Sequence, residues 1–122
     1  MQVFEPHGPR FQLALERLRE GDAFTFEGVS FWLAPEGYLT VSVQSSMRIE
    51  NTREQTALAD LQRAMHIVSE LVATNASFAT IANAHPQRFS LIHDYGTGSV
   101  ELAQLVDGQI VWAKGMPFSK TT

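Results

Sequence analysis

The feature that most constrains this 122-residue chain is a long amphipathic segment in its middle. The sequence TREQTALADLQRAMHIVSELVAT, residues 52–74, places apolar side chains at intervals of three and four residues. That spacing gathers them on one face of a single α-helix, which must be buried against another layer of structure. The apolar stripe consists of Leu58, Leu61, Ala64, Met65, Val68, Leu71 and Val72.

Segments that precede and follow this helix in the sequence repeat their hydrophobic pattern every two residues, and they supply the second layer. They alternate apolar with polar side chains, which is typical of antiparallel strands with one buried face. Pro35-Glu36-Gly37 is a turn signal within the first group, and Asp107-Gly108 within the second group is a strong signal for a two-residue hairpin turn. The candidate strands are residues 24–26, 29–33, 39–43, 88–95, 99–106 and 109–113.

A shorter N-terminal helix over residues 9–20 completes the expected order α-β-β-β-α-β-β-β. The predicted fold is α+β, a single layer of mainly antiparallel β-sheet with about five to six strands, packed by the long helix and the N-terminal helix. The sequence leaves the secondary structure of two segments undecided. Residues 75–86 fit a short helix capped by Ser77 or an edge strand, and residues 99–106 fit a hairpin strand or a short helix.

Composition narrows the classes of function. The length suits a single domain over residues 1–122. The chain is acidic, with a formal net charge of −4, and its nine Lys and Arg residues form no basic run, so no nucleic-acid partner is expected. With no signal-peptide pattern and no membrane-spanning run, a cytoplasmic protein without membrane contact is expected. Because the chain has no cysteine, thiolate metal sites and cysteine nucleophiles are excluded.

The stretch HDYGTGS near the C-terminus has some features of a phosphate-binding loop. A dinucleotide-binding fingerprint needs a third glycine after Gly96 and Gly98, where Glu101 stands instead, and a Walker loop needs a lysine that is missing here. In a strand, His93 and Asp94 point to opposite faces and cannot hold one metal together. No metal or cofactor is therefore expected, and the stretch is predicted to be the turn between two strands.

An alternative is a small-ligand or enzyme site beside this turn, because loops on a rigid scaffold often carry function. His85 approaches His93 if the loop before Pro86 folds back. His66, on the central helix, is expected to be a partly buried structural histidine rather than a zinc ligand. The residues of this candidate site are His85, His93, Asp94, Gly96 and Gly98.

An aromatic pair gives a candidate interface. If Val29, Phe31 and Leu33 face the core, Trp32 points outward, beside Tyr38 across the first turn. Either the two helices cover one face of the sheet each and bury this pair, or the pair is offered to a partner.

No nucleophile elbow, metal spacing or phosphate loop is present in the sequence, which favours binding over catalysis. The leading hypothesis is a non-enzymatic protein-interaction or regulatory module, expected to be a homodimer whose sheet edges pair across a two-fold axis. In element order alone, the chain resembles roadblock-type regulators of small GTPases and dimeric secretion chaperones. It differs from both in the extra segment 75–86 and in having no helix after Trp112. An immunity or inhibitor protein for a cognate partner is a further hypothesis.

Overall fold

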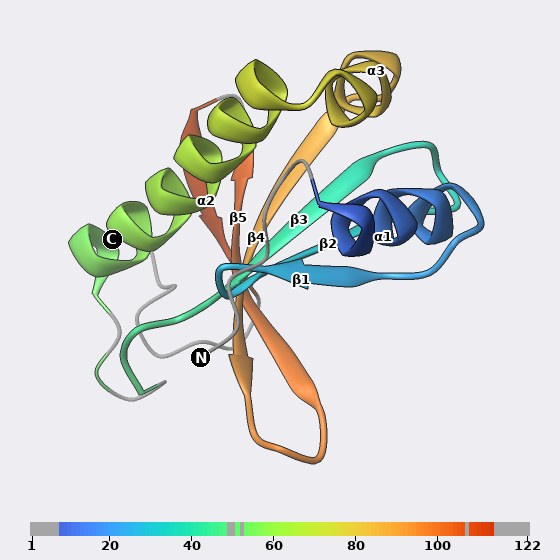
Figure 1. Cartoon of the computed structure of the whole chain (residues 1–122). Helices are drawn as coiled ribbons and strands as arrows, with labels where there is room; N and C mark the ends of the chain where they lie inside the picture. The colour runs from blue at the N-terminus through green and yellow to red at the C-terminus, as the bar shows by residue number, and fades with distance from the viewer. Residues whose placement is uncertain (1–7, 49–50, 52, 107, 114–122) are drawn as a thin grey trace.

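The computed structural model describes residues 8–48, 51, 53–106 and 108–113 (Figure 1). The predicted α+β class and element order are confirmed, with one more helix after the long one. Residues 76–84 of the first undecided segment are helical, and residues 99–106 are a strand. The elements are α1 (Pro9–Arg19), β1 (Phe24–Phe26), β2 (Val29–Leu33), β3 (Leu39–Gln44), α2 (Glu54–Thr74), α3 (Ala76–Ala84), β4 (Gln87–Asp94), β5 (Ser99–Val106) and β6 (Gln109–Trp112).

The six strands form one sheet in the order β1-β2-β3-β4-β5-β6. All neighbours are antiparallel except β3 and β4, which run parallel in the centre of the sheet. The connection between β3 and β4 passes through α2 and α3. Parallel neighbours need such a crossover, because the chain must return to the end of the sheet at which the first strand began. Val106 pairs with Gln109, and Gly108 has a φ of +80°. Asp107, the other residue of the predicted hairpin turn, lies outside the described residues.

A cluster of phenylalanines joins two of the helices to the sheet. Phe11 of α1 meets Phe24 and Phe26 edge-on, with ring centroids 5.8 and 5.6 Å apart. Phe31 stacks on Phe24 at 4.9 Å and meets Phe78 of α3 edge-on at 5.6 Å. Because Phe24 and Phe31 are directly opposite in neighbouring strands, both helices lie on the same face of the sheet.

The central helix α2 packs on that same face, and its buried apolar side chains belong to the same core (Figure 1). The expectation that one helix covers each face was therefore wrong. The helices α1 and α2 both bury an apolar stripe. Only the face of the sheet that carries Phe31, Val41 and Leu91 is apolar enough to pack against these stripes.

The buried side of α2 is turned slightly from the predicted stripe. Leu58 and Met65 are 36% and 40% exposed, whereas Asp60 is 6% exposed. Oδ2 of Asp60 accepts hydrogen bonds from the backbone N–H of Ser46 at 2.9 Å and from its hydroxyl at 3.1 Å. Because Ser46, just after the end of β3, satisfies the carboxylate with these bonds, the side of α2 that carries Asp60 can face the interior. The buried residues of α2 are Ala57, Asp60, Leu61, Ala64, Ile67, Val68 and Leu71.

Asn75 ends α2 and begins α3. Its buried side chain accepts a hydrogen bond from the Phe78 backbone N–H at 2.8 Å, which satisfies one of the free donors in the first turn of α3. The helical alternative predicted Ser77 as the N-cap. That position was wrong, because the N-cap is Asn75. At the other end, His85 is extended because it precedes Pro86. None of the helices in the described part of the chain combines the length and the apolar character that a membrane crossing requires.

Candidate functional site

The face of the sheet away from the helices carries a row of short polar side chains. Strand register places them opposite one another across β1 to β5, so that neighbours in the row are about 5 Å apart. Two of them, Ser42 and Ser90, are only 2% and 3% exposed. The row consists of Thr25, Ser30, Ser42, Ser90 and Gln104.

A second row lies beside the first, one step nearer to the β2–β3 turn. It contains Trp32, Thr40 and Arg88, which are opposite one another in β2, β3 and β4. The guanidinium of Arg88 lies over the ring of Tyr38, with Cζ 4.3 Å from the ring centroid. The second row, Ser42 and Ser90 of the first row, and the Pro35-Glu36 turn help to line a cavity of about 420 Å³, called here the outer-face cavity. Its other lining residues are Ala34, Ile92, Ser99 and Glu101.

The outer-face cavity contains buried hydroxyl groups without partners. Thr40 is 4% exposed. Neither its Oγ1 nor Oγ of Ser42 makes a hydrogen bond to any described residue. Such groups are rare in folded proteins and need an explanation. The predicted pair Trp32 and Tyr38 lies on this face, half-buried, with Trp32 lining the cavity and Tyr38 stacked against Arg88. Their role as an interface stays a prediction.

The structure does not bring His85 and His93 together. Nδ1 of His85 lies 3.2 Å from the carbonyl oxygen of Gly37, in the β2–β3 turn. His93 is near the far end of β4, eight residues away along an extended strand, which corresponds to about 26 Å. A site that uses both imidazoles is therefore incompatible with this fold.

The HDYGTGS stretch forms a hairpin turn between β4 and β5, as predicted. Oδ1 of Asp94 accepts a hydrogen bond from the Gly96 backbone N–H at 2.7 Å, and the Tyr95 N–H donates to the Gly98 carbonyl at 2.9 Å. The ring of His93 meets that of Tyr95 edge-on at 4.7 Å, and its buried Nδ1 has no partner among the described residues. Asp94 is thus occupied in shaping its own turn. A ligand role for these residues stays a prediction.

The two glycines of this turn differ in backbone conformation, which gives a matched test. Gly96 has a φ of +89°, whereas Gly98 lies outside the left-handed region, and a Cβ at either would meet no atom within 4 Å. We expect Gly96→Ala to lower the free energy of unfolding by about 1 kcal/mol and Gly98→Ala to change it by less than about 0.5 kcal/mol. Urea denaturation measures both, and equal losses would contradict the assigned turn geometry.

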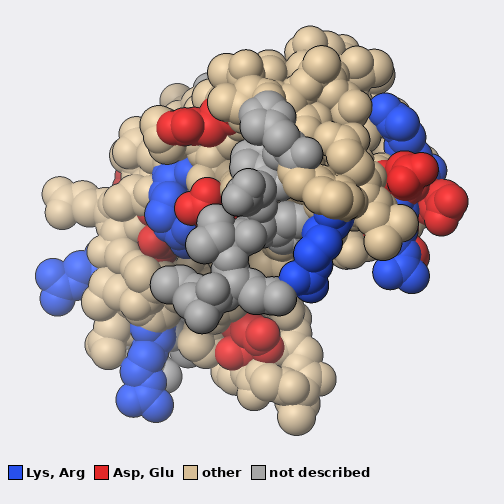
Figure 2. Space-filling model, in the orientation of Figure 1, with Lys and Arg blue, Asp and Glu red and all other residues tan. Residues whose placement is uncertain are grey.

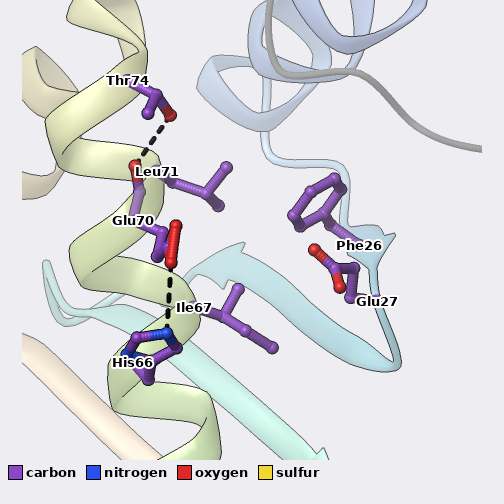
Figure 3. A pocket seen from close by; sticks show the side chains of 7 residues that line it. All are labelled: Phe26, Glu27, His66, Ile67, Glu70, Leu71 and Thr74. Carbon is purple, nitrogen blue, oxygen red and sulfur yellow. Dashed lines mark hydrogen bonds and ion pairs between the residues drawn. The ribbon is translucent and has the colours of Figure 1, made fainter.

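A second cavity, of about 410 Å³, lies between α2 and the β1–β2 turn (Figure 3). Figure 3 shows Ile67 and Leu71 pointing from α2 toward Phe26. Nε2 of His66 lies 3.1 Å from Oε1 of Glu70, and these side chains are 74% and 61% exposed. The expectation that His66 is partly buried was therefore wrong, because the imidazole forms an exposed i,i+4 pair with Glu70.

Glu27 lies on the opposite side of this second cavity (Figure 3). Phe26 pairs with Val29, so Glu27 and Gly28 form a two-residue turn, with φ of +52° and +81°. Positive φ at both positions is characteristic of a type I′ hairpin turn, in which asparagine and glycine are the preferred residues. Nη1 of Arg63 donates to the Glu27 carbonyl at 3.3 Å and ties the turn to α2.

The outer edge of the sheet at β6 carries apolar side chains that are exposed on one face and half-buried on the other. Val106 and Val111 are 44% and 53% exposed on the outer face, and Ile110 and Trp112 are half-buried on the helix face. Among the described residues, β6 pairs with β5 alone. With the exposed residues of α2, this surface is called the β6-edge surface; it consists of Leu58, Met65, Val106, Ile110, Val111 and Trp112.

Leu58 and Met65 belong to this surface because of their position around α2. They project about 150° away from Arg63, whose side chain reaches the β1–β2 turn. They therefore lie on the flank of α2 that faces β5 and β6. Figure 1 shows α1 near β1 and β2, so no described helix covers the part of the sheet beyond α2.

Charged side chains do not gather into one patch in the view of Figure 2, where Lys and Arg are interspersed with Asp and Glu. Within the residues that the structure describes, no three His, Asp or Glu side chains come together as a metal site would require. Charge and metal chemistry thus give no direction here, and the two cavities and the β6-edge surface remain as the features that bear on function. No protein-family model, no curated protein and no solved structure matches this chain.

Proposed function

We propose that this protein is a protein–protein interaction module that acts by binding and forms a homodimer through the β6-edge surface. The observation that carries the proposal is an edge hairpin with exposed apolar side chains on its outer face and only half-buried apolar side chains on its helix face. Natural proteins usually protect sheet edges with charged residues, proline or a covering element, because a free edge pairs readily with another strand. Here Val106 and Val111 stand at that edge with no charged neighbour in β6 itself.

A second copy of the chain is the partner that fits this geometry. Two antiparallel β6 strands can pair across a two-fold axis, which continues the sheet from one copy to the other. The same axis brings Leu58 and Met65 of one α2 toward the helix-side residues of the other copy. The partly exposed apolar groups of both copies are then buried together, which is the main stabilising contribution in such interfaces.

Light scattering over a range of concentrations tests the proposal. The unchanged protein is expected to reach twice the 13.6 kDa mass of one chain. Met65→Glu places a charge in the proposed interface and is expected to raise the dissociation constant at least about tenfold, equivalent to about 1.4 kcal/mol. Val111→Lys is expected to act in the same direction, because lysine is a natural blocker of edge pairing.

Leu13→Glu is the matched control. Leu13 is 56% exposed, more than Met65, and lies on α1 near β1, at the edge of the sheet opposite to β6. It is expected to leave the dissociation constant unchanged. A strictly monomeric mass at concentrations up to about 1 mM, or equal weakening by all three substitutions, would contradict the proposed dimer.

A further inference from the structure

We infer that the outer-face cavity is a binding site for a small organic carboxylate with a planar, apolar body. The cavity lies on the face of the sheet that no described helix covers, and its volume of about 420 Å³ falls within the usual range for small-molecule sites. This inference is independent of the proposed dimer, since it rests on β2, β3, β4 and the start of β5 rather than on the β6 edge.

Arg88 is the group that selects a carboxylate. Its guanidinium is held against the Tyr38 ring, and it makes no ion pair with any described carboxylate. An arginine fixed by stacking keeps its N–H donors available in the fork geometry that a carboxylate matches with two parallel hydrogen bonds. Glu36 and Glu101 also line the cavity, and their negative charge favours a singly charged carboxylate over a phosphate.

Unpartnered hydroxyls provide the second, independent observation. Thr40 and Ser42 line the cavity, and their hydroxyl oxygens are buried and lack a hydrogen-bond partner among the described residues. A buried hydroxyl without a partner destabilises the folded chain, whereas a bound ligand with acceptor oxygens would satisfy it.

Trp32 accounts for the planar, apolar body of the ligand. Trp32 is directly opposite Thr40 in β2, and Arg88 is opposite Thr40 on its other side in β4, so all three residues belong to one row on the outer face. The separation across these two strand spacings is about 10 Å between Cβ atoms. A ring of the size of benzene, bearing one carboxylate, spans the space between them.

The test uses sodium benzoate, with benzamide as a neutral ligand of nearly the same shape. Benzoate is expected to bind with a dissociation constant on the order of 1 mM, measured from backbone amide shifts in NMR titrations. The saturable shifts should centre on Thr40, Ser42 and Ser90, and benzamide should bind at least about fivefold more weakly. Inorganic phosphate that binds more tightly than benzoate, or equal binding of benzamide, would overturn the carboxylate assignment.

Substitutions at Arg88 test its role. Arg88→Gln is expected to weaken benzoate at least about tenfold, and Arg88→Lys to weaken it less, because the charge remains while the fork is lost. Arg19→Gln, at an exposed position on α1, is the matched control and should leave affinity unchanged. Affinity that is insensitive to Arg88→Gln would overturn the proposal.

Thr40→Val separates a binding role from a structural one, because valine has the shape of threonine without the hydroxyl. The variant is expected to raise the thermal unfolding midpoint by about 2–5 °C, since an unsatisfied buried group is removed. It should also weaken benzoate at least about threefold. A higher midpoint with unchanged affinity would show that the Thr40 hydroxyl does not contact the ligand and would overturn that part of the site.

Discussion

Replacing Phe31 with alanine is expected to lower the free energy of unfolding by about 4 kcal/mol, the largest effect of any single substitution considered for this chain. Phe31 is fully buried in β2. Its ring stacks on Phe24 at 4.9 Å and meets Phe78 of α3 edge-on at 5.6 Å. The substitution removes the apolar transfer energy of the ring and leaves a cavity that surrounding side chains fill only in part.

Denaturation by urea at neutral pH, followed by circular dichroism, measures this loss. Leu13→Ala removes a large apolar side chain that is 56% exposed, and it is expected to change stability by less than about 0.5 kcal/mol. Phe31→Leu keeps much of the volume and should fall between the two. A loss of less than about 1.5 kcal/mol for Phe31→Ala would contradict the placement of this ring between the sheet and α3.

The second largest effect is expected at Asp60, which a reading of the helix pattern assigns to solvent. Asp60→Ala should lower the free energy of unfolding by about 2–3 kcal/mol. The carboxylate accepts two hydrogen bonds from Ser46, and both donors are partly buried and would lose their acceptor. Hydrogen bonds to a charged group are worth more than those between neutral groups.

Two further variants test whether the loss of stability comes from the contact between Asp60 and Ser46. Asp60→Asn keeps an acceptor oxygen in nearly the same place and should recover part of the loss. Glu70→Ala removes an acidic side chain on the same helix that is 61% exposed and paired with His66, and it should cost less than about 0.5 kcal/mol. If Asp60→Ala costs no more than Glu70→Ala, the contact with Ser46 does not stabilise the fold.

Sequence periodicity predicts the elements well because it is a local property. The alternation from Phe24 to Val43 and the three- and four-residue spacing of α2 each depend on neighbours a few residues away. The side of the sheet chosen by each helix depends on the whole fold. The aromatic cluster around Phe31 is assembled from α1, β1, β2 and α3, and it places α1 and α3 on the face on which α2 also packs.

The outer-face cavity could not be predicted for the same reason. Ser42 and Ser90 are 48 positions apart in the chain and become neighbours only through the parallel pairing of β3 with β4. In the sequence they are ordinary polar residues of two alternating strands. Only Trp32 and Tyr38 carried a signal, because large aromatic residues at outward positions of a strand require an explanation. The predicted approach of His85 to His93 was wrong because an extended strand, β4, separates the two residues, and residues that are close in sequence lie far apart at the two ends of a strand.

Asp60 shows a further limit of pattern-based prediction. A carboxylate on the edge of an apolar stripe reads as solvent-exposed, since ionised groups are rarely buried. Its burial depends on donors at Ser46, which lie beyond the start of the helix. A polar side chain is thus placed correctly only when the partner that satisfies it is known.

The parallel pairing of β3 with β4 has a consequence for how this chain folds. It divides the sheet into two antiparallel halves, β1-β2-β3 and β4-β5-β6, and each half is one continuous stretch of chain. Hairpins within a half close short loops, whereas joining the halves closes the long loop from residue 45 to residue 86. The pairing of β3 with β4 therefore bears most of the loop-closure entropy of the topology, and we expect substitutions that weaken it to slow folding more than substitutions within either hairpin.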